Sequence, residues 1–98
     1  MKKTLKTLSK ITKILLVDDS LINRALLTDI LSDEYTIVEA ENGKEAVEIV
    51  KNAKPDEFAV VLMDVQMPIM DGYQATKAIR ELSDTTLAEV PIIAMTAN

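Results

Sequence analysis

Three carboxylates and one hydroxyl in this sequence could together bind a cation and accept a phosphoryl group. They are Asp18, Asp19, Asp64 and Thr96. Each lies at or directly after the end of a short apolar run, at residues 14–17, 59–63 and 91–95. A continuous apolar run of this length, rich in Val and Ile, is typical of a strand buried on both faces of a parallel sheet. Because ligands bind at the carboxyl ends of such strands, we expect the four side chains to meet at one edge of one sheet.

The acidic members of this set favour magnesium chemistry. An isolated Asp has a pKa of about 3.9, and close packing raises the cost of ionising several at once. A divalent cation removes that cost, and Mg²⁺ typically takes one or two carboxylates together with waters and phosphate oxygens. We expect Asp19 and Asp64 to bind Mg²⁺ directly and Asp18 to bind it through water. The backbone carbonyl of Gln66 could complete the shell. Asp64 could then attack phosphorus as a nucleophile, while Thr96 hydrogen-bonds a phosphoryl oxygen.

The composition excludes several other kinds of site. A chain of 98 residues suits one small domain, and 48% apolar with 28% charged residues is typical of a folded globular chain. There is no Cys and no His, which excludes disulfides, thiolate metal sites and imidazole catalysis. Any metal must therefore be a hard cation held by oxygen. Two Tyr and one Phe are too few for a stacking platform that binds single-stranded nucleic acid.

Positive charge is concentrated at the start of the chain. Residues 1–13 hold five of the eleven basic residues and no acid, so the remainder carries six bases against all sixteen acids. Such an acidic body is unsuited to nucleic acid or to an anionic membrane. The apolar run at 14–17 is too short for a signal peptide or a membrane span, so we expect a cytoplasmic protein. Leu5, Leu8 and Ile11 lie three apart, but we expect residues 1–12 to be a solvated basic leader rather than an anchor or docking helix.

The elements that must position the site alternate between strand and helix. Strands are predicted at about 13–17, 36–40, 59–64 and 91–96, and helices at about 21–33, 44–53 and 73–82. This alternation specifies a parallel sheet with helices on both faces. Ser20 is a good N-cap, whereas Asn42-Gly43 and Asp71-Gly72 are turn signals, with Asp71 outside the site. Helical spacing predicts buried faces at Ile22, Leu26, Leu27, Ile30 and Leu31; at Ala46, Val47, Val50 and Ala53; and at Ala75, Ile79 and Leu82.

Three stretches resemble the receiver domain of response regulators in two-component signalling. They are LLVDDS at 15–20, LMDVQMPIMDG at 62–72 and PIIAMTA at 91–97. The resemblance covers residues 13–98 and implies a flavodoxin-like, doubly wound parallel sheet with strand order 2-1-3-4. It implies that Asp64 is the phospho-acceptor and that Thr96 moves toward the phosphate. The donor would be a phosphohistidine on a sensor histidine kinase or a histidine phosphotransfer protein. Such a domain is no enzyme beyond its own Mg²⁺-dependent phosphorylation.

The resemblance also implies that the domain is incomplete at its C-terminus. Receivers continue after the Thr strand with a helix, a fifth strand and a final helix, about 30 residues at average element lengths. The fifth strand supplies a Lys that pairs with the phosphoryl group and usually an aromatic residue that reports the switch. Lys77 cannot be that Lys, because it lies on the third predicted helix. DDSLINRALL and IIAMTAN look more like receivers attached to hybrid kinases than like stand-alone regulators.

Without a final helix, one face of the sheet would be bare. Val61 and Met63 or their alternates, with neighbours in 92–95, would then face water, and the last strand would be an open edge. We therefore expect a polypeptide that ends at Asn98 to pair with a second copy through this face and edge or by exchanging elements, unless the protein continues.

Three other functions share part of the pattern. A flavin-binding electron carrier has the same topology, but its phosphate needs amides and hydroxyls where this chain has Asp18 and Asp19; a colourless protein would exclude it. A phosphatase of the haloacid-dehalogenase type also uses a strand-end Asp, but with a second Asp where this chain has Gln66, and turnover of a generic phosphate ester would identify it. A receiver-like interaction module that is never phosphorylated is the third.

Overall fold

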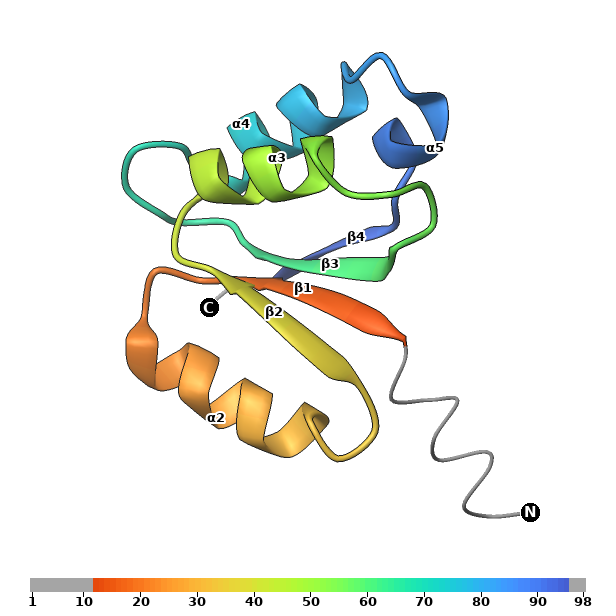
Figure 1. Cartoon of the computed structure of the whole chain (residues 1–98). Helices are drawn as coiled ribbons and strands as arrows, with labels where there is room; N and C mark the ends of the chain where they lie inside the picture. The colour runs from red at the N-terminus through yellow and green to blue at the C-terminus, as the bar shows by residue number, and fades with distance from the viewer. Residues whose placement is uncertain (1–11, 96–98) are drawn as a thin grey trace, which may run out of the picture.

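The computed structural model describes residues 12–95, which form one four-stranded sheet with helices on both faces (Figure 1). Along the chain the elements are β1 (Lys13–Val17), α2 (Leu21–Leu31), β2 (Thr36–Ala40), α3 (Gly43–Lys51), β3 (Phe58–Asp64), α4 (Gly72–Arg80), α5 (Thr85–Ala88) and β4 (Ile92–Met95). The strands are parallel and lie in the order β2-β1-β3-β4. The predicted α/β sheet and strand order are confirmed. Except for Thr12, the basic leader lies outside the described residues.

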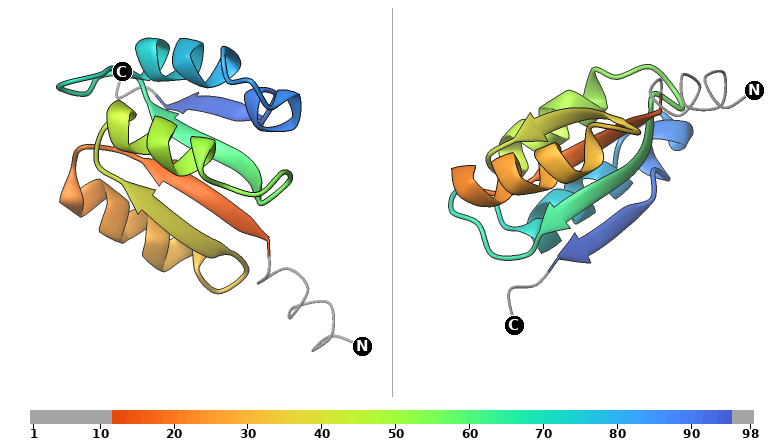
Figure 2. Two further views of the ribbon diagram at one scale, coloured as in Figure 1. Left: turned by 45° about the horizontal axis from the view of Figure 1, so that its top comes forward. Right: turned by 90° about the horizontal axis from the view of Figure 1, so that it is seen from below.

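The main core fills the space between the sheet and the helices α3 and α4, while α2 lies on the opposite face (Figures 1 and 2). Its fully buried members include Leu15 and Val17 from β1, Val61 and Met63 from β3, Val50 from α3 and Ile79 from α4. Since successive side chains of a strand point to opposite faces, the buried Ile14 and Leu16 lie on the α2 face. Both faces of β1 are therefore apolar, as a central parallel strand requires.

The register of the strands brings their carboxyl ends to one edge. Val17, the last residue of β1, pairs with Met63 of β3, and Asp64 pairs with Met95, the last residue of β4. The residues that follow β1 therefore lie beside the end of β3. This is the arrangement that the apolar runs predicted.

Polar side chains begin three of the helices close to that edge. Ser20 accepts a backbone N–H at 3.2 Å, which confirms the predicted cap of α2. Asn42, predicted to lie in a turn, caps α3 in the same way at 2.8 Å. Asp71 caps α4 through a reciprocal pair with Gln74: each side chain accepts the other's backbone N–H, at 2.8 and 3.0 Å. These caps satisfy donors that a helix start leaves free and fix where each helix begins.

The buried face predicted for α2 is partly wrong. Three of its expected members are largely exposed: Ile22, Leu26 and Ile30, at 79%, 58% and 63%. The side turned toward the sheet instead carries Arg24, Leu27, Thr28 and Leu31, all half-buried and at helical spacing. Arg24, on this side, donates a hydrogen bond to the carbonyl of Asp18 at 2.7 Å. The apolar stripe is wider than the surface that the described elements cover.

The other two predicted faces are confirmed. Ala46, Val50, Ala75 and Ile79 are buried, and Val47, Ala53 and Leu82 are half-buried. The segment 83–89, which follows the third predicted helix, contains the short helix α5. Its cap is Asp84, whose carboxylate accepts the N–H groups of Thr86 and Leu87 at 2.9 and 3.2 Å.

The bare face expected beside β3 and β4 is smaller than predicted. Val61 and Met63 are fully buried, and of their alternates Leu62 is half-buried. Ile93, which pairs with Leu62, is 55% exposed. Within residues 12–95 no helix is long and apolar enough to cross a bilayer.

Candidate functional site

Three carboxylates converge where β1 and β3 end. Asp18, Asp19 and Asp64 each bring one oxygen to within 4.8 Å of the others. Asp18 is buried, Asp64 is half-buried and Asp19 is exposed, so the cluster opens to solvent on one side. The sequence placed these three together from the strand-end rule alone, and the structure confirms that they meet.

Asp18 is the most firmly held of the three, with 6% of its surface exposed. Its Oδ1 accepts the N–H of Ser20 at 2.8 Å, and the side-chain amide of Asn23 lies 3.5 Å from its Oδ2. Its backbone N–H donates to the carbonyl of Ala40 on β2 at 3.1 Å. These bonds orient a carboxylate that is otherwise costly to bury.

Arg24 braces the same turn. Its Nη1 donates to the carbonyl oxygen of Asp18 at 2.7 Å, and its Nε pairs with Glu39 of β2 at 3.0 Å. The guanidinium therefore links the β1–α2 turn to the neighbouring strand β2. It makes no hydrogen bond to the side chains of the three clustered aspartates. Sequence reasoning missed Arg24 and Asn23; the available signal was their place on the first turn of the helix that follows the acidic pair.

Asp64 has a perturbed ionisation. Desolvation raises the pKa of its carboxyl group, and the charges of Asp18 and Asp19 raise it further. The backbone N–H of Gln66 donates to Asp64 Oδ1 at 3.2 Å and opposes the rise in pKa. Desolvation and two neighbouring negative charges thus disfavour the ionised carboxylate, and a bound cation would oppose both effects.

Of the two remaining predicted site residues, the structure describes Gln66 but not Thr96. Gln66 lies two residues past Asp64 in the β3–α4 loop, next to the carboxylate cluster, and is exposed. Thr96 lies outside the described residues; Met95, which precedes it, pairs with Asp64 and accepts the N–H of Val65 at 3.1 Å. Asp71 caps α4.

The β3–α4 loop is held by close backbone contacts. Gly72 donates to the carbonyl of Val65 at 2.9 Å, and Gly43 at the start of α3 donates to that of Met70 at 3.2 Å. Ile69 has a φ of 71°, a left-handed conformation that is uncommon for a β-branched residue. The side chain of Ile69 is 77% exposed beside a hollow of about 510 Å³ that Gln66 and Tyr73 help to line.

The donor set fits a hard divalent cation. All three convergent side chains offer carboxylate oxygen, and one is buried without a cationic side chain bonded to it. Oxygen ligands of this kind, left partly open to solvent, suit Mg²⁺ with its retained waters.

Comparison with known proteins places these features in one family. The family model for the response regulator receiver domain matches residues 14–98. A hybrid signal transduction histidine kinase B from Dictyostelium discoideum is 46% identical over 91% of this chain and 5% of its own length. The chemotaxis protein CheY of Halobacterium salinarum is 53% identical over 70% of this chain and 56% of its own length. The chain thus spans about half or less of each of these two relatives.

Solved structures agree with the fold. The receiver domain of the sensor histidine kinase PA1611 from Pseudomonas aeruginosa, solved with a magnesium ion in its active-site cleft, has a TM-score of 0.80 and 34% identity over 89% of this chain and 68% of that one. The receiver domain of the histidine kinase CKI1 from Arabidopsis thaliana, complexed with Mg²⁺ and BeF₃⁻, has a TM-score of 0.80 and 29% identity over 97% of this chain and 72% of that one.

Proposed function

This chain belongs to the response regulator receiver family, and from that premise we propose that residues 13–98 accept a phosphoryl group on Asp64 and thereby switch the contacts of the domain with its partners. The observation that carries the proposal is the meeting of Asp64 with Asp18 and Asp19 at one sheet edge. Clustered carboxylates destabilise a fold, so a desolvated Asp beside two others needs a functional reason.

Phosphoryl transfer requires mainly that the chain position the reacting groups and neutralise their charge. A carboxylate oxygen of Asp64 forms a bond to phosphorus, the P–N bond of a donor phosphohistidine breaks, and its electron pair returns to the imidazole. We propose that Asp19, Asp64 and the carbonyl of Gln66 hold Mg²⁺ directly and that Asp18 holds it through water. When bound, the ion supplies the positive charge that lets phosphate oxygens approach this acidic mouth.

The residues around the cluster have supporting roles. The bonds from Ser20 and Arg24 fix the turn that carries Asp18, and the Gln66 N–H orients Asp64. Thr96, the residue after Met95 in the sequence, is proposed to hydrogen-bond the phosphoryl group, since Met95 pairs with Asp64.

The partners follow from this chemistry. We propose a sensor histidine kinase or a histidine phosphotransfer protein as the donor and a cytoplasmic location, with residues 1–12 forming a basic leader. The excess of acids over bases in the body argues against nucleic acid and anionic membranes as partners. The domain is a signalling module, and self-phosphorylation is the one reaction proposed for it.

A second copy of the chain is proposed to cover the exposed apolar surface on the α2 side. Its members are Leu21, Ile22, Leu26, Ile30 and Ile93, between 55% and 79% exposed. Among the described residues β4 pairs only with β3, so its other side offers unpaired backbone groups. Pairing of two polypeptides of residues 1–98, or exchange of elements between them, would bury both features.

The direct test of phosphorylation uses acetyl phosphate as a small donor. The protein is incubated with it in the presence and absence of Mg²⁺, and intact mass is measured. Mg²⁺-dependent addition of one phosphoryl group supports the proposal, whereas an unchanged mass at saturating donor contradicts it.

A further inference from the structure

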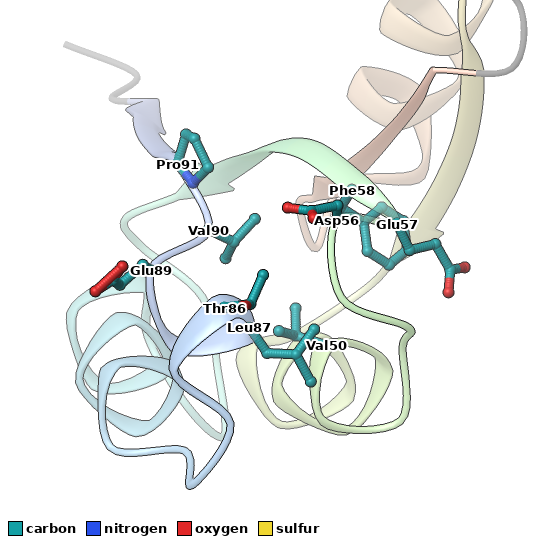
Figure 3. Close-up of a pocket in the computed structure, with 9 residues that line it drawn as sticks. All are labelled: Val50, Asp56, Glu57, Phe58, Thr86, Leu87, Glu89, Val90 and Pro91. Atoms are coloured by element: carbon teal, nitrogen blue, oxygen red, sulfur yellow. The ribbon is translucent and has the colours of Figure 1, made fainter.

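A second hollow lies at the edge of the sheet opposite the carboxylate cluster. It has a volume of about 280 Å³ and lies among α5, the end of α3 and the starts of β3 and β4 (Figure 3). Its floor is apolar and consists of Val50, Phe58, Leu87 and Val90, each of them at most 9% exposed. The proposed phosphoryl transfer makes no use of this hollow.

The rim of the hollow is acidic. Asp56 and Glu89 are exposed and lie on opposite sides of the opening, with Leu87 and Val90 between them in Figure 3. Among the described residues neither carboxylate has a hydrogen bond or an ion pair. The third acid of the rim, Glu57, is already bound to Lys13 at 2.9 Å. Two negative charges above an apolar floor therefore lack a partner.

The nearby cations leave Asp56 and Glu89 without an ion pair among the described residues, because Lys13 and Lys54 both lie beside Glu57. Arg80 points its Nη1 at the carbonyl oxygens of Ala88 and Val90, at 2.5 and 2.8 Å, which ties α4 to α5 behind the hollow. Lys13 is bound to Glu57. The rim thus retains a net negative charge, and it favours an occupant that is both cationic and apolar.

The start of this chain has that chemistry and begins at this edge. Lys13, the first residue of β1, pairs in register with Phe58 of the floor, and its ammonium group is bound to Glu57 of the rim. Residues 1–11 carry four Lys and no acid, and they include Leu5, Leu8 and Ile11. From Thr12 back to Leu5 the chain can extend about 25 Å, so this segment can reach the hollow.

We infer that the hollow is the docking site of the chain's own residues 1–11. Apolar side chains of the segment cover Phe58, Leu87 and Val90, while its Lys side chains approach Asp56 and Glu89. The Lys13–Glu57 ion pair is the last contact of this series and the only one within the described residues. Because the segment is covalently attached, weak contacts suffice to hold it. The inference replaces the solvated leader that the sequence pattern favoured.

The test uses the absence of natural Cys from the chain. Two double variants are compared. In the first, Leu5→Cys with Thr86→Cys, a disulfide would join the segment to the rim. In the second, Leu5→Cys with Lys44→Cys, a disulfide would join it to the far end of α3. Both target positions are exposed. A disulfide forms only when the two Cα atoms come within about 7 Å, so its rate under mild oxidation reports proximity. Mobility and mass under non-reducing conditions separate bonds within one chain from bonds between chains.

Docking predicts that the intramolecular bond to position 86 forms roughly tenfold faster than the bond to position 44, since a bound segment has a higher effective concentration at its own site. Adding Asp56→Asn and Glu89→Gln should slow the first reaction severalfold, whereas Glu45→Gln and Glu48→Gln on α3 should not. Asn tolerates the left-handed backbone that Asp56 adopts, with a φ of 64°. Equal rates for the two pairs, no effect of the rim charges, or a bond to position 86 that forms only between chains would each overturn the inference.

Discussion

Gly72 lies so close to Asp64 that a Cβ atom on Gly72 would come within 2.4 Å of the carbonyl oxygen of Asp64. The same atom would lie 2.9 Å from the Cα of Val65. The first residue of α4 is thus packed directly on the end of the strand that carries the proposed phospho-acceptor. Gly72 permits this approach because it has no side chain, and the contact fixes the position of Asp64 relative to α4.

Gly72→Ala should therefore destabilise the domain. In an open helix the change would stabilise it by up to about 1 kcal/mol, because Ala is the better helix former. Here the clash with backbone atoms should reverse the sign and cost roughly 1–3 kcal/mol, the range for overpacking. Urea unfolding measures the change. Gly43→Ala, which meets Met70 rather than Asp64, is the matched control: it should also destabilise, but only Gly72→Ala should weaken Mg²⁺ binding.

Asp64→Asn should abolish phosphorylation, because the amide cannot act as the nucleophile. Intact mass after incubation with acetyl phosphate and Mg²⁺ should show no added phosphoryl group. Asp71→Asn is the control, since Asn caps a helix as well as Asp does and should leave labelling unchanged. Undiminished labelling of the Asp64 variant would assign the acceptor to another residue.

Asp19→Asn should weaken Mg²⁺ binding by more than tenfold, or about 1.4 kcal/mol, because it removes a direct ligand. Calorimetric titration measures the affinity. Asp33→Asn, at an exposed position in the turn after α2, removes the same charge far from the cluster and should have little effect. Asn23 is unsuitable as a control because its amide lies 3.5 Å from Asp18. Equal affinity of native protein and the Asp19 variant would exclude the proposed ligand set.

Metal-free stability should depend on pH through Asp64. Desolvation, followed by the charges of Asp18 and Asp19, raises its pKa above that of the unfolded chain. Its favourable contribution is therefore complete below the unfolded pKa, near 3.9, and is lost as pH rises through the folded-state pKa. At neutral pH with a chelator, Asp64→Asn should be more stable than the native protein by roughly 0.2–1 kcal/mol, the range for partly exposed charges.

Thermal unfolding at a series of pH values checks this dependence. The difference between the Asp64 variant and the native protein should shrink as the medium becomes acidic, and saturating Mg²⁺ should reverse its sign at neutral pH. If the difference in stability between the two proteins stays constant across the pH series, the ionisation of Asp64 does not destabilise the fold.

A polypeptide of residues 1–98 should self-associate at micromolar concentration. Each large side chain left in water on the α2 side forgoes roughly 1.5–3 kcal/mol, against a total stability of only about 5–15 kcal/mol for a domain. Ile22→Ser combined with Ile93→Ser should weaken the association measured by light scattering. Tyr73→Ser removes a side chain that is 70% exposed on α4 and serves as the control. A compact monomer that unfolds cooperatively at the same concentration would contradict the proposal.

The sequence by itself determined the order of the four strands and the three longer helices, and the meeting of the three carboxylates. Apolar runs of four or five residues fix strands, and in a parallel sheet every strand ends at the same edge. Asp18, Asp19 and Asp64 each follow or end such a run, so their convergence depends on local pattern and topology alone. The cap at Ser20 is equally local, because its oxygen bonds an N–H three residues away.

Tertiary structure alone decided which side of α2 is buried and what Gly72 does. The stripe on α2 contains more apolar residues than one contact face can cover, and on the side that is half-buried Arg24 bonds the Asp18 carbonyl and Glu39. The Asp71-Gly72 pair has the pattern of an ordinary turn, yet Gly72 is required by its distance to Asp64. Both outcomes depend on contacts between separate segments of the chain, and no periodicity or local propensity encodes such distances.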